Sequence, residues 1–306
     1  MIAISALDKI LQGLMQRYEN RVPNVRQIID CMVRSNLIEC SSDIENDHIA
    51  FRTLGVPQLG IRSLEKVFLH HGYQRRDAYR FEKKKLDAYW YSPPEKHFPR
   101  IFISELRVDA LSLDAQKIIN SYTSEVVTDP VDQLDLDDAD QVIQFLHQPL
   151  WRTPTWADYE FLSNESEYAA WVIYNRYYLN HFTISVHNLP GDFGRLAEFN
   201  DFLEKHGFQL NDSGGKIKSS TDGLLLQSST VAEMIEAEFS DGASGVELHD
   251  IAGSYVEFAE RLVLPEFNSL RRSELKREHR REGFEAANAD KIFESTYAEQ
   301  TSRVSG

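Results

Sequence analysis

Two histidines and one glutamate carry the chemistry that this sequence offers most clearly. His48 and His181 each stand near the start of a short apolar run, DHIAFR and NHFTIS, and Glu257 stands within the apolar stretch SYVEFAER. Two imidazoles and one carboxylate form a facial triad, which holds Fe(II) and leaves coordination positions open. Strand alternation would place Tyr255, Glu257 and Ala259 on one face. An unpaired carboxylate on an inner face is costly, so Glu257 needs a cation or a strong partner.

Each of the two histidines also has an ordinary structural interpretation. A histidine in a half-buried strand is usually a polar residue with satisfied hydrogen bonds, and for either one taken singly that interpretation is favoured. Their equivalent positions in an internal repeat favour metal ligands instead. The other histidines are assigned to helix ends, loops or the surface: His70, His71, His97, His147, His187, His206, His249 and His279.

Arg52 is the candidate for binding an anionic ligand. It follows His48 by four residues on the same expected strand, so alternation places both side chains on one face. A bidentate guanidinium suits a carboxylate ligand. A salt bridge to a nearby acid explains an arginine at this position equally well, and the residues alone leave the choice open.

An internal repeat links the two histidines. The segments LEKVFLHHGYQ and NDFLEKHGFQ share a His-Gly-aromatic-Gln sequence around Gly72 and Gly207. His48 precedes Gly72 by 24 residues (72 − 48), and His181 precedes Gly207 by 26 residues (207 − 181). A matching order of elements at matching distances indicates a duplicated unit.

Each unit is predicted to have the order β-α-β-β-β. The expected elements of the first unit are a strand at 48–52, a helix at 61–71, and strands at 78–82, 86–91 and 100–108. Those of the second unit are a strand at 181–186, a helix at 193–206, and strands at 216–219, 224–228 and 254–261. Gly72 and Gly207 are expected to end the two helices in a left-handed conformation. An additional excursion of undetermined form is expected between residues 232 and 248.

The remaining segments are expected to be mainly helical and to complete one catalytic domain spanning residues 1–306. Its parts are a helical N-terminal region broken near Pro23 (1–45), the first unit (46–110), a helical connection (111–178), the second unit (179–264) and a C-terminal segment (265–306). Amphipathic helices are expected at 111–122 and 164–178. The acidic stretch 132–140 is expected to be a solvated loop or helix start. Alternating basic and acidic residues in 271–282 predict an exposed helix there rather than an anion site.

Composition restricts the class of protein. With 306 residues and 42% hydrophobic residues, the chain can bury a sizeable core. No stretch approaches the roughly 20 apolar residues of a membrane-spanning helix, and the N-terminus does not resemble a signal peptide. The net charge of −15 argues against a general nucleic-acid partner, although it permits a small anionic substrate. Two cysteines, Cys31 and Cys40, are too few for a disulfide framework, so we expect a cytoplasmic protein.

Two adjacent β-α-β-β-β units resemble the vicinal oxygen chelate superfamily. The resemblance implies an α+β fold in which the strands curl into an open barrel, with helices added at the N-terminus, between the units and at the C-terminus. It also implies metal ligands on the first and last strands of the units, at His48, Glu105, His181 and Glu257. Glu105 would be either a fourth ligand or an acceptor for a ligand histidine's N–H.

Several segments further resemble the 2-oxoadipate dioxygenase/decarboxylase family over nearly the whole chain. They are His48-x-x-x-Arg52, the Asn180-His181 strand start, YVEFAER and the tail GFEAANADKIFEST. The resemblance implies an Fe(II) cofactor held by His48, His181 and Glu257, with Arg52 binding a substrate carboxylate. The implied reaction consumes O2 and 2-oxoadipate and releases 2-hydroxyglutarate and CO2.

Two other classes of function remain open at this stage. A glyoxalase-like or hydrolytic enzyme would use Zn2+ or Ni2+ without oxygen and would recruit Glu105 as a ligand or base. A non-catalytic protein of the same fold would bind a small ligand, although an intact His, His, Glu set argues against this alternative. The identity of the metal, the preferred 2-oxo acid and the oligomeric state are not determined by the sequence.

Overall fold

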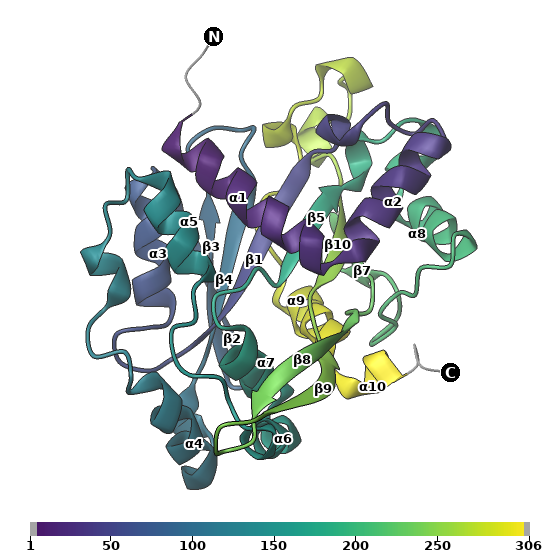
Figure 1. Cartoon of the computed structure of the whole chain (residues 1–306). Helices are drawn as coiled ribbons and strands as arrows, with labels where there is room; N and C mark the ends of the chain where they lie inside the picture. The colour runs from purple at the N-terminus through teal and green to yellow at the C-terminus, as the bar shows by residue number, and fades with distance from the viewer. Residues whose placement is uncertain (1–4, 303–306) are drawn as a thin grey trace.

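A curled eight-stranded sheet, with strand order β2-β3-β4-β1-β5-β10-β7-β6, organises the computed structural model, which describes residues 5–302 (Figure 1). The first half contains β1 (Asn46–Leu54), α3 (Ile61–His70), β2 (Gln74–Phe81), β3 (Leu86–Ser92) and β4 (Arg100–Leu106). The second half contains β5 (His181–Ser185), α8 (Leu196–Lys205), β6 (Lys218–Ser219), β7 (Leu225–Ser229) and β10 (Tyr255–Arg261).

The two halves repeat the same topology outward from a central seam. β1 pairs with β4 in parallel, and β5 pairs with β10 in parallel in the same way. β1 and β5 pair antiparallel with each other, so the first strand of each half lies at the seam. The duplicated β-α-β-β-β order is therefore confirmed. Gly72 and Gly207 follow the corresponding helices with φ values of 87° and 88°, the left-handed conformation expected of a glycine cap.

Helices cover the sheet and connect its halves. The break near Pro23 separates α1 (Ala6–Arg21) from α2 (Pro23–Arg34), because proline is tolerated in the first turn of a helix but not inside one. The connection between the halves contains α4 (Leu113–Thr123), α5 (Ala139–His147), α6 (Trp156–Glu165) and α7 (Glu167–Asn175). The predicted single helix at 164–178 is wrong at its start. Ser166 is extended and caps α7 by accepting a hydrogen bond from the Ala169 N–H.

Two segments take forms that the sequence either left open or predicted wrongly. The excursion after β7 is a hairpin of β8 (Met234–Ser240) and β9 (Val246–Ala252), separate from the main sheet. The exposed helix predicted for 271–282 is wrong, because that segment contains only two short 3-10 turns, Arg272–Glu274 and Arg277–His279. Two of its basic side chains bind backbone carbonyls of distant segments. The Arg277 guanidinium donates to Phe98 O at 2.8 Å and the Arg280 guanidinium to Arg261 O at 2.7 Å.

The C-terminal segment returns to the concave face of the sheet. It forms α9 (Ala286–Ile292), a 3-10 turn at Phe293–Thr296 and α10 (Ala298–Thr301). α9, drawn in yellow in Figure 1, contacts β2 at one end of the sheet and β6 and β7 at the other. Within residues 5–302, none of the helices is both long and apolar enough to cross a membrane.

Candidate metal centre

Three strands of the seam bring His48, His181 and Glu257 together. β1 carries His48, β5 carries His181 and β10 carries Glu257, and their ligand atoms all lie within 4.8 Å of one another. His181 Nε2 lies 3.3 Å from His48 Nε2 and 3.1 Å from Glu257 Oε2. The third edge, from His48 Nε2 to Glu257 Oε1, measures 3.5 Å. These three residues were singled out from the sequence.

Burial and charge set the protonation of the three side chains, which are at most 5% exposed. Burial lowers the pKa of His181 to about 3, and the Glu257 charge opposes this only in part. Burial alone would also lower the pKa of His48, but Glu257 and the hydrogen bond to Asp47 outweigh it and raise the value. Burial alone would raise the pKa of Glu257, but the two histidines outweigh it and lower the value. A neutral imidazole at His181 and an ionised Glu257 are forms in which these groups bind metals.

The donor set fits a divalent metal ion. Two imidazole nitrogens and a carboxylate converge in a buried place, and both Nε2 atoms point toward the same point as the carboxylate. The opposite ring nitrogens are already engaged, His48 Nδ1 with Asp47 Oδ1 at 2.8 Å and His181 Nδ1 with Asn180 Oδ1 at 3.1 Å. Metal-binding histidines usually donate their second N–H to such an acceptor, which leaves the other nitrogen free for the ion. His48, His181 and Glu257 could therefore hold the metal, with Gln227 donating to Glu257 Oε1 at 2.6 Å.

A small apolar cavity adjoins the three residues. Its volume is about 20 Å³, enough for an ion or a water molecule. The C-terminal segment supplies much of its wall, and the residues that line it outside the triad are Phe102, Gln227, Phe284, Ala289, Ile292 and Phe293. The Phe284 ring packs edge-on against His48, with ring centroids 4.7 Å apart. This wall limits the access of water to the candidate metal position.

Arg52 lies beside this cavity, and within residues 5–302 no carboxylate forms an ion pair with it. Its guanidinium donates to Thr296 Oγ1 at 2.9 Å and to Phe293 O at 3.0 Å, and its Nε has no partner. The side chain is 1% exposed and lies near the rings of Tyr168, Trp171 and Phe293. The salt bridge that was the alternative explanation for Arg52 is therefore not formed. A buried guanidinium without a counterion favours binding of an anion.

Glu105 does not join the candidate site, which corrects the expectation of a fourth ligand or an acceptor for a ligand histidine. Its carboxylate accepts a hydrogen bond from the backbone N–H of Ile61 at 2.8 Å, at the start of α3. The strand register explains the error. Thr183, two residues after His181, pairs with Glu257, whereas Ala50, two residues after His48, pairs with Phe102. The counterpart of Glu257 is therefore Phe102, and Glu105, three residues further along β4, faces the other side of the sheet.

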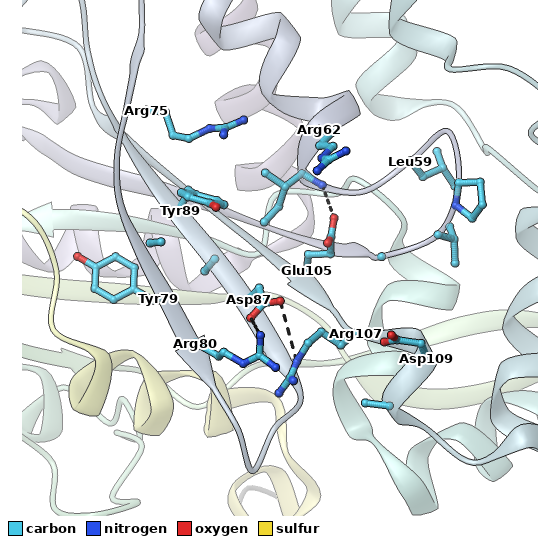
Figure 2. A pocket seen from close by; sticks show the side chains of 17 residues that line it. Leu59, Arg62, Arg75, Tyr79, Arg80, Asp87, Tyr89, Glu105, Arg107 and Asp109 are labelled. Carbon is cyan, nitrogen blue, oxygen red and sulfur yellow. Dashed lines mark hydrogen bonds and ion pairs between the residues drawn. The ribbon is translucent and has the colours of Figure 1, made fainter.

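That other side carries a large hollow, with a volume of about 1130 Å³. Figure 2 shows Glu105 directed toward the start of α3 and Asp87 between Arg80 and Arg107. Arg75, Arg80, Asp87 and Arg107, which line this hollow, form ion pairs with neighbouring groups. The sheet separates the hollow from the triad. Another histidine and aspartate group, His70, His71 and Asp137, lies at the surface, where water competes for its ligand atoms.

The structure adds residues that the sequence analysis did not single out. Asp47 and Asn180 contact the two histidines, Thr183 Oγ1 lies 3.1 Å from His48 Nε2, and the Tyr255 ring lies against His181 with centroids 4.9 Å apart. The sequence held a signal for Asp47 and Asn180, because each directly precedes the repeated histidine. For Gln227 there was no such signal, since a glutamine in a strand has many ordinary roles.

Comparisons with known proteins agree with the geometry. The sequence model of the 2-oxoadipate dioxygenase/decarboxylase family matches residues 10–273. The chain is 42% identical to the chloroplastic 2-oxoadipate dioxygenase/decarboxylase of Arabidopsis thaliana, over 100% of this chain and 81% of that protein. Hydroxyglutarate synthase from Oryza sativa, solved in complex with 2-oxoadipate, superposes with a TM-score of 0.84 at 43% identity, over 95% of this chain and 92% of that chain. A protein from Ralstonia eutropha named for the glyoxalase superfamily has a related fold, with a TM-score of 0.70 at 19% identity over 90% of this chain and 85% of that chain.

The match to the family covers most of the described chain, and the relatives share more than two fifths of its residues. The fold agrees with the open barrel of the vicinal oxygen chelate type that two β-α-β-β-β units imply. This chain belongs to the 2-oxoadipate dioxygenase/decarboxylase family.

Proposed function

We propose that this protein is an Fe(II)-dependent enzyme that converts 2-oxoadipate and O2 into 2-hydroxyglutarate and CO2. The observation that carries the proposal is the buried group of His48, His181 and Glu257 beside an arginine that has no carboxylate partner. The names of the relatives, which refer to 2-oxoadipate and to hydroxyglutarate, support the choice of substrate and product.

The three proposed ligands account for the choice of metal. A two-histidine, one-carboxylate set is the usual protein environment of non-haem Fe(II) in oxygenases, and it leaves positions free for other ligands. When bound, the iron would supply the binding of the 2-oxo acid and the activation of O2. Gln227 would hold the carboxylate of Glu257 in a fixed orientation by its hydrogen bond of 2.6 Å.

Arg52 would orient the substrate. Its Nε is an available buried donor, and its two terminal nitrogens contact neutral oxygens of Phe293 and Thr296 that a substrate carboxylate could replace. The carboxyl group next to the keto carbon would be lost as CO2. If Arg52 holds the other carboxylate of the substrate, that contact determines which carbon of the shortened acid faces the metal. The atoms balance, because CO2 leaves with the two oxygens of the carboxyl group next to the keto carbon. Both oxygens of O2 enter the hydroxy acid, one in its new carboxylate and one in its hydroxyl group.

Substrate entry would require movement of the cavity wall. A cavity of about 20 Å³ cannot contain a six-carbon diacid. The side chains that would move to admit the substrate are those of Phe284, Ile292 and Phe293 on the C-terminal segment. Once the wall closes again, these side chains would exclude bulk water from the reacting groups.

The glyoxalase-like alternative depended on a residue that lies away from the candidate metal site. It used Glu105 as a fourth ligand or base, and Glu105 lies on the opposite side of the sheet and binds the start of α3. An assay under argon separates the two chemistries. The proposal expects 2-hydroxyglutarate only with Fe(II) and O2, and turnover with Zn2+ alone or without oxygen would overturn it.

We also propose that the protein works in a reducing compartment, with the cytoplasm as the expected location. Cys31 is buried, Cys40 is exposed, and both are free thiols. Free cysteines are typical of a reducing compartment.

A further inference from the structure

In both halves of the protein, the residue directly before the candidate ligand histidine binds that histidine's Nδ1. Asp47 Oδ1 lies 2.8 Å from His48 Nδ1, and Asn180 Oδ1 lies 3.1 Å from His181 Nδ1. The pairs occupy equivalent places in the duplicated units, at the seam between β1 and β5. The same contact therefore occurs in both halves, with a carboxylate in the first half and an amide in the second.

In the first half, the strand is irregular where this contact is made. Successive side chains of a regular strand point to opposite faces, so Asp47 and His48 would normally diverge. The register of β1 against β5 shifts between Asn46 and Ile49, which marks a bulge at Asp47 and His48. In the second half, Asn180 directly precedes β5, which begins at His181, and its backbone N–H donates to Ala50 O at 2.9 Å.

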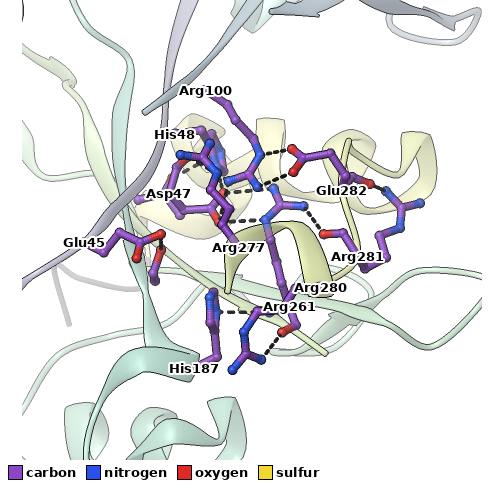
Figure 3. Close-up of polar contacts among 12 residues, drawn as sticks. Glu45, Asp47, His48, Arg100, His187, Arg261, Arg277, Arg280, Arg281 and Glu282 are labelled. Atoms are coloured by element: carbon purple, nitrogen blue, oxygen red, sulfur yellow. Dashed lines mark hydrogen bonds and ion pairs between the residues drawn. The ribbon is translucent and has the colours of Figure 1, made fainter. Parts of the chain in front are cut away.

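Two buried arginines hold the Asp47 carboxylate (Figure 3). The Arg261 guanidinium donates through Nε to Oδ2 at 2.6 Å and through a terminal nitrogen to Oδ1 at 2.9 Å. Arg100 donates to Oδ2 at 3.2 Å, and all three side chains are at most 1% exposed. Arg100 also forms an ion pair with Glu282, and Arg261 donates to Gly283 O at 2.7 Å. The network connects His48 to the residues that precede Phe284 in the cavity wall.

We propose that Asp47 and Asn180 are positioning residues that set the orientation and tautomer of the two ligand histidines. An oxygen acceptor at Nδ1 keeps the proton on that nitrogen, which leaves the Nε2 lone pair for the metal. The carboxylate of Asp47 makes His48 the more electron-rich of the two ligands, whereas the neutral amide of Asn180 has a weaker effect on His181. This inference rests on the proposed metal site.

The first test is the affinity of the full-length protein for Co2+, measured by competition with a chelator. Asp47→Asn preserves the size of the side chain and removes its charge, and we expect the Co2+ dissociation constant to rise by about 10–100-fold. Glu282→Gln is the matched control, because it removes one carboxylate from the same arginine network without touching His48. Glu282→Gln should reduce the melting temperature but keep the dissociation constant of the wild type.

Asn180→Ala is the second variant, and it decides the question if Asp47→Asn does not fold. No arginine depends on the Asn180 side chain in the described contacts, so this variant should fold and bind Co2+ more weakly than the wild type. An Asn180→Ala variant with wild-type affinity would overturn the inference, and a folded Asp47→Asn variant with wild-type affinity would overturn the effect assigned to the charge of Asp47. So would a Glu282→Gln variant that loses as much affinity as Asp47→Asn, since a general loss of packing would then explain both. A wild-type protein that binds no Co2+ would instead refute the proposed metal site.

Discussion

The Nε2 atoms of His48 and His181 lie 3.3 Å apart although 133 residues separate the two histidines in the chain. The contact arises because the first strand of each half pairs with the first strand of the other, with Ala50 opposite His181. β10 lies parallel to β5 and adds Glu257 from the second half. Neither half alone contains the complete donor set, so the candidate site depends on correct pairing of the duplicated units.

Removal of any one proposed ligand should abolish most metal binding. His48→Ala, His181→Ala and Glu257→Ala each leave two protein ligands, and we expect loss of most iron and nearly all turnover with the fold retained. Metal analysis of the purified variants together with circular dichroism measures both properties. If one of these variants keeps full iron content and rate, that residue is not a ligand.

Glu105→Ala is the matched control for those variants. Its loss removes the acceptor for the Ile61 N–H at the start of α3, which should reduce the free energy of unfolding by about 1 kcal/mol, as for other lost helix N-terminal contacts. Iron content and turnover should be unchanged. A Glu105→Ala protein that folds but lacks metal would show that the strand register assigned to β4 is incorrect.

Replacement of Arg52 should impair use of the substrate without releasing the metal. A charge-assisted hydrogen bond contributes about 1.5–3 kcal/mol, which corresponds to a fall in kcat/KM of roughly 10–100-fold for Arg52→Ala. Arg52→Lys should recover only part of the rate, because an ammonium cannot form the planar two-pronged contact. Steady-state kinetics with 2-oxoadipate and iron analysis provide the two measurements.

Arg62 offers a control for the Arg52 variants, since it is exposed and lies on α3, on the other side of the sheet. Arg62→Ala should retain wild-type kinetics. Normal kcat/KM in a destabilised Arg52→Ala protein would assign Arg52 a structural role only, and the substrate assignment would then depend on similarity to relatives.

Mild acid should destabilise the protein through His187. Burial lowers the pKa of this histidine to about 3, and its Nδ1 accepts a hydrogen bond from the Arg261 backbone N–H at 3.2 Å. The unfolded chain binds the proton near pH 6.5 but the folded chain does not, so stability falls as pH decreases below that value. The slope approaches about 1.4 kcal/mol per pH unit for one histidine.

Urea unfolding at several pH values between 7.5 and 5 measures this effect as a difference between the wild type and His187→Gln. The variant cannot take up the proton, so its stability should fall less steeply with acid. Parallel pH profiles for the two proteins would mean that His187 takes up its proton as readily in the folded protein as in the unfolded chain.

The repeat made the larger part of the fold and of the site predictable from the sequence. Glycine-ended helices at matching distances from His48 and His181 fixed the order of elements, and the i and i+4 spacing placed Arg52 on the same face as His48. The sequence did not predict the register in which distant strands pair. The choice between Phe102 and Glu105 as the counterpart of Glu257 depends on the register of β4 against β1, which local patterns do not determine.

Two further features depend on tertiary contacts that the sequence did not predict. The charges of residues 271–282 follow a helical pattern, but Arg277 and Arg280 bind the carbonyls of Phe98 and Arg261, and the segment forms only short 3-10 turns. Asp47 was visible in the repeated sequence before each histidine, yet its role depends on Arg100 and Arg261, which the strand order brings from distant positions.

The most direct test of the account is to measure O2 uptake, CO2 release and 2-hydroxyglutarate formation together during turnover of 2-oxoadipate by the Fe(II)-loaded protein. The proposed reaction predicts that the three quantities agree, one for one, with the 2-oxoadipate consumed, and that all of them stop when oxygen is removed. Consumption of 2-oxoadipate without matching O2 uptake, or its complete absence in the iron-loaded protein, would contradict the proposed function.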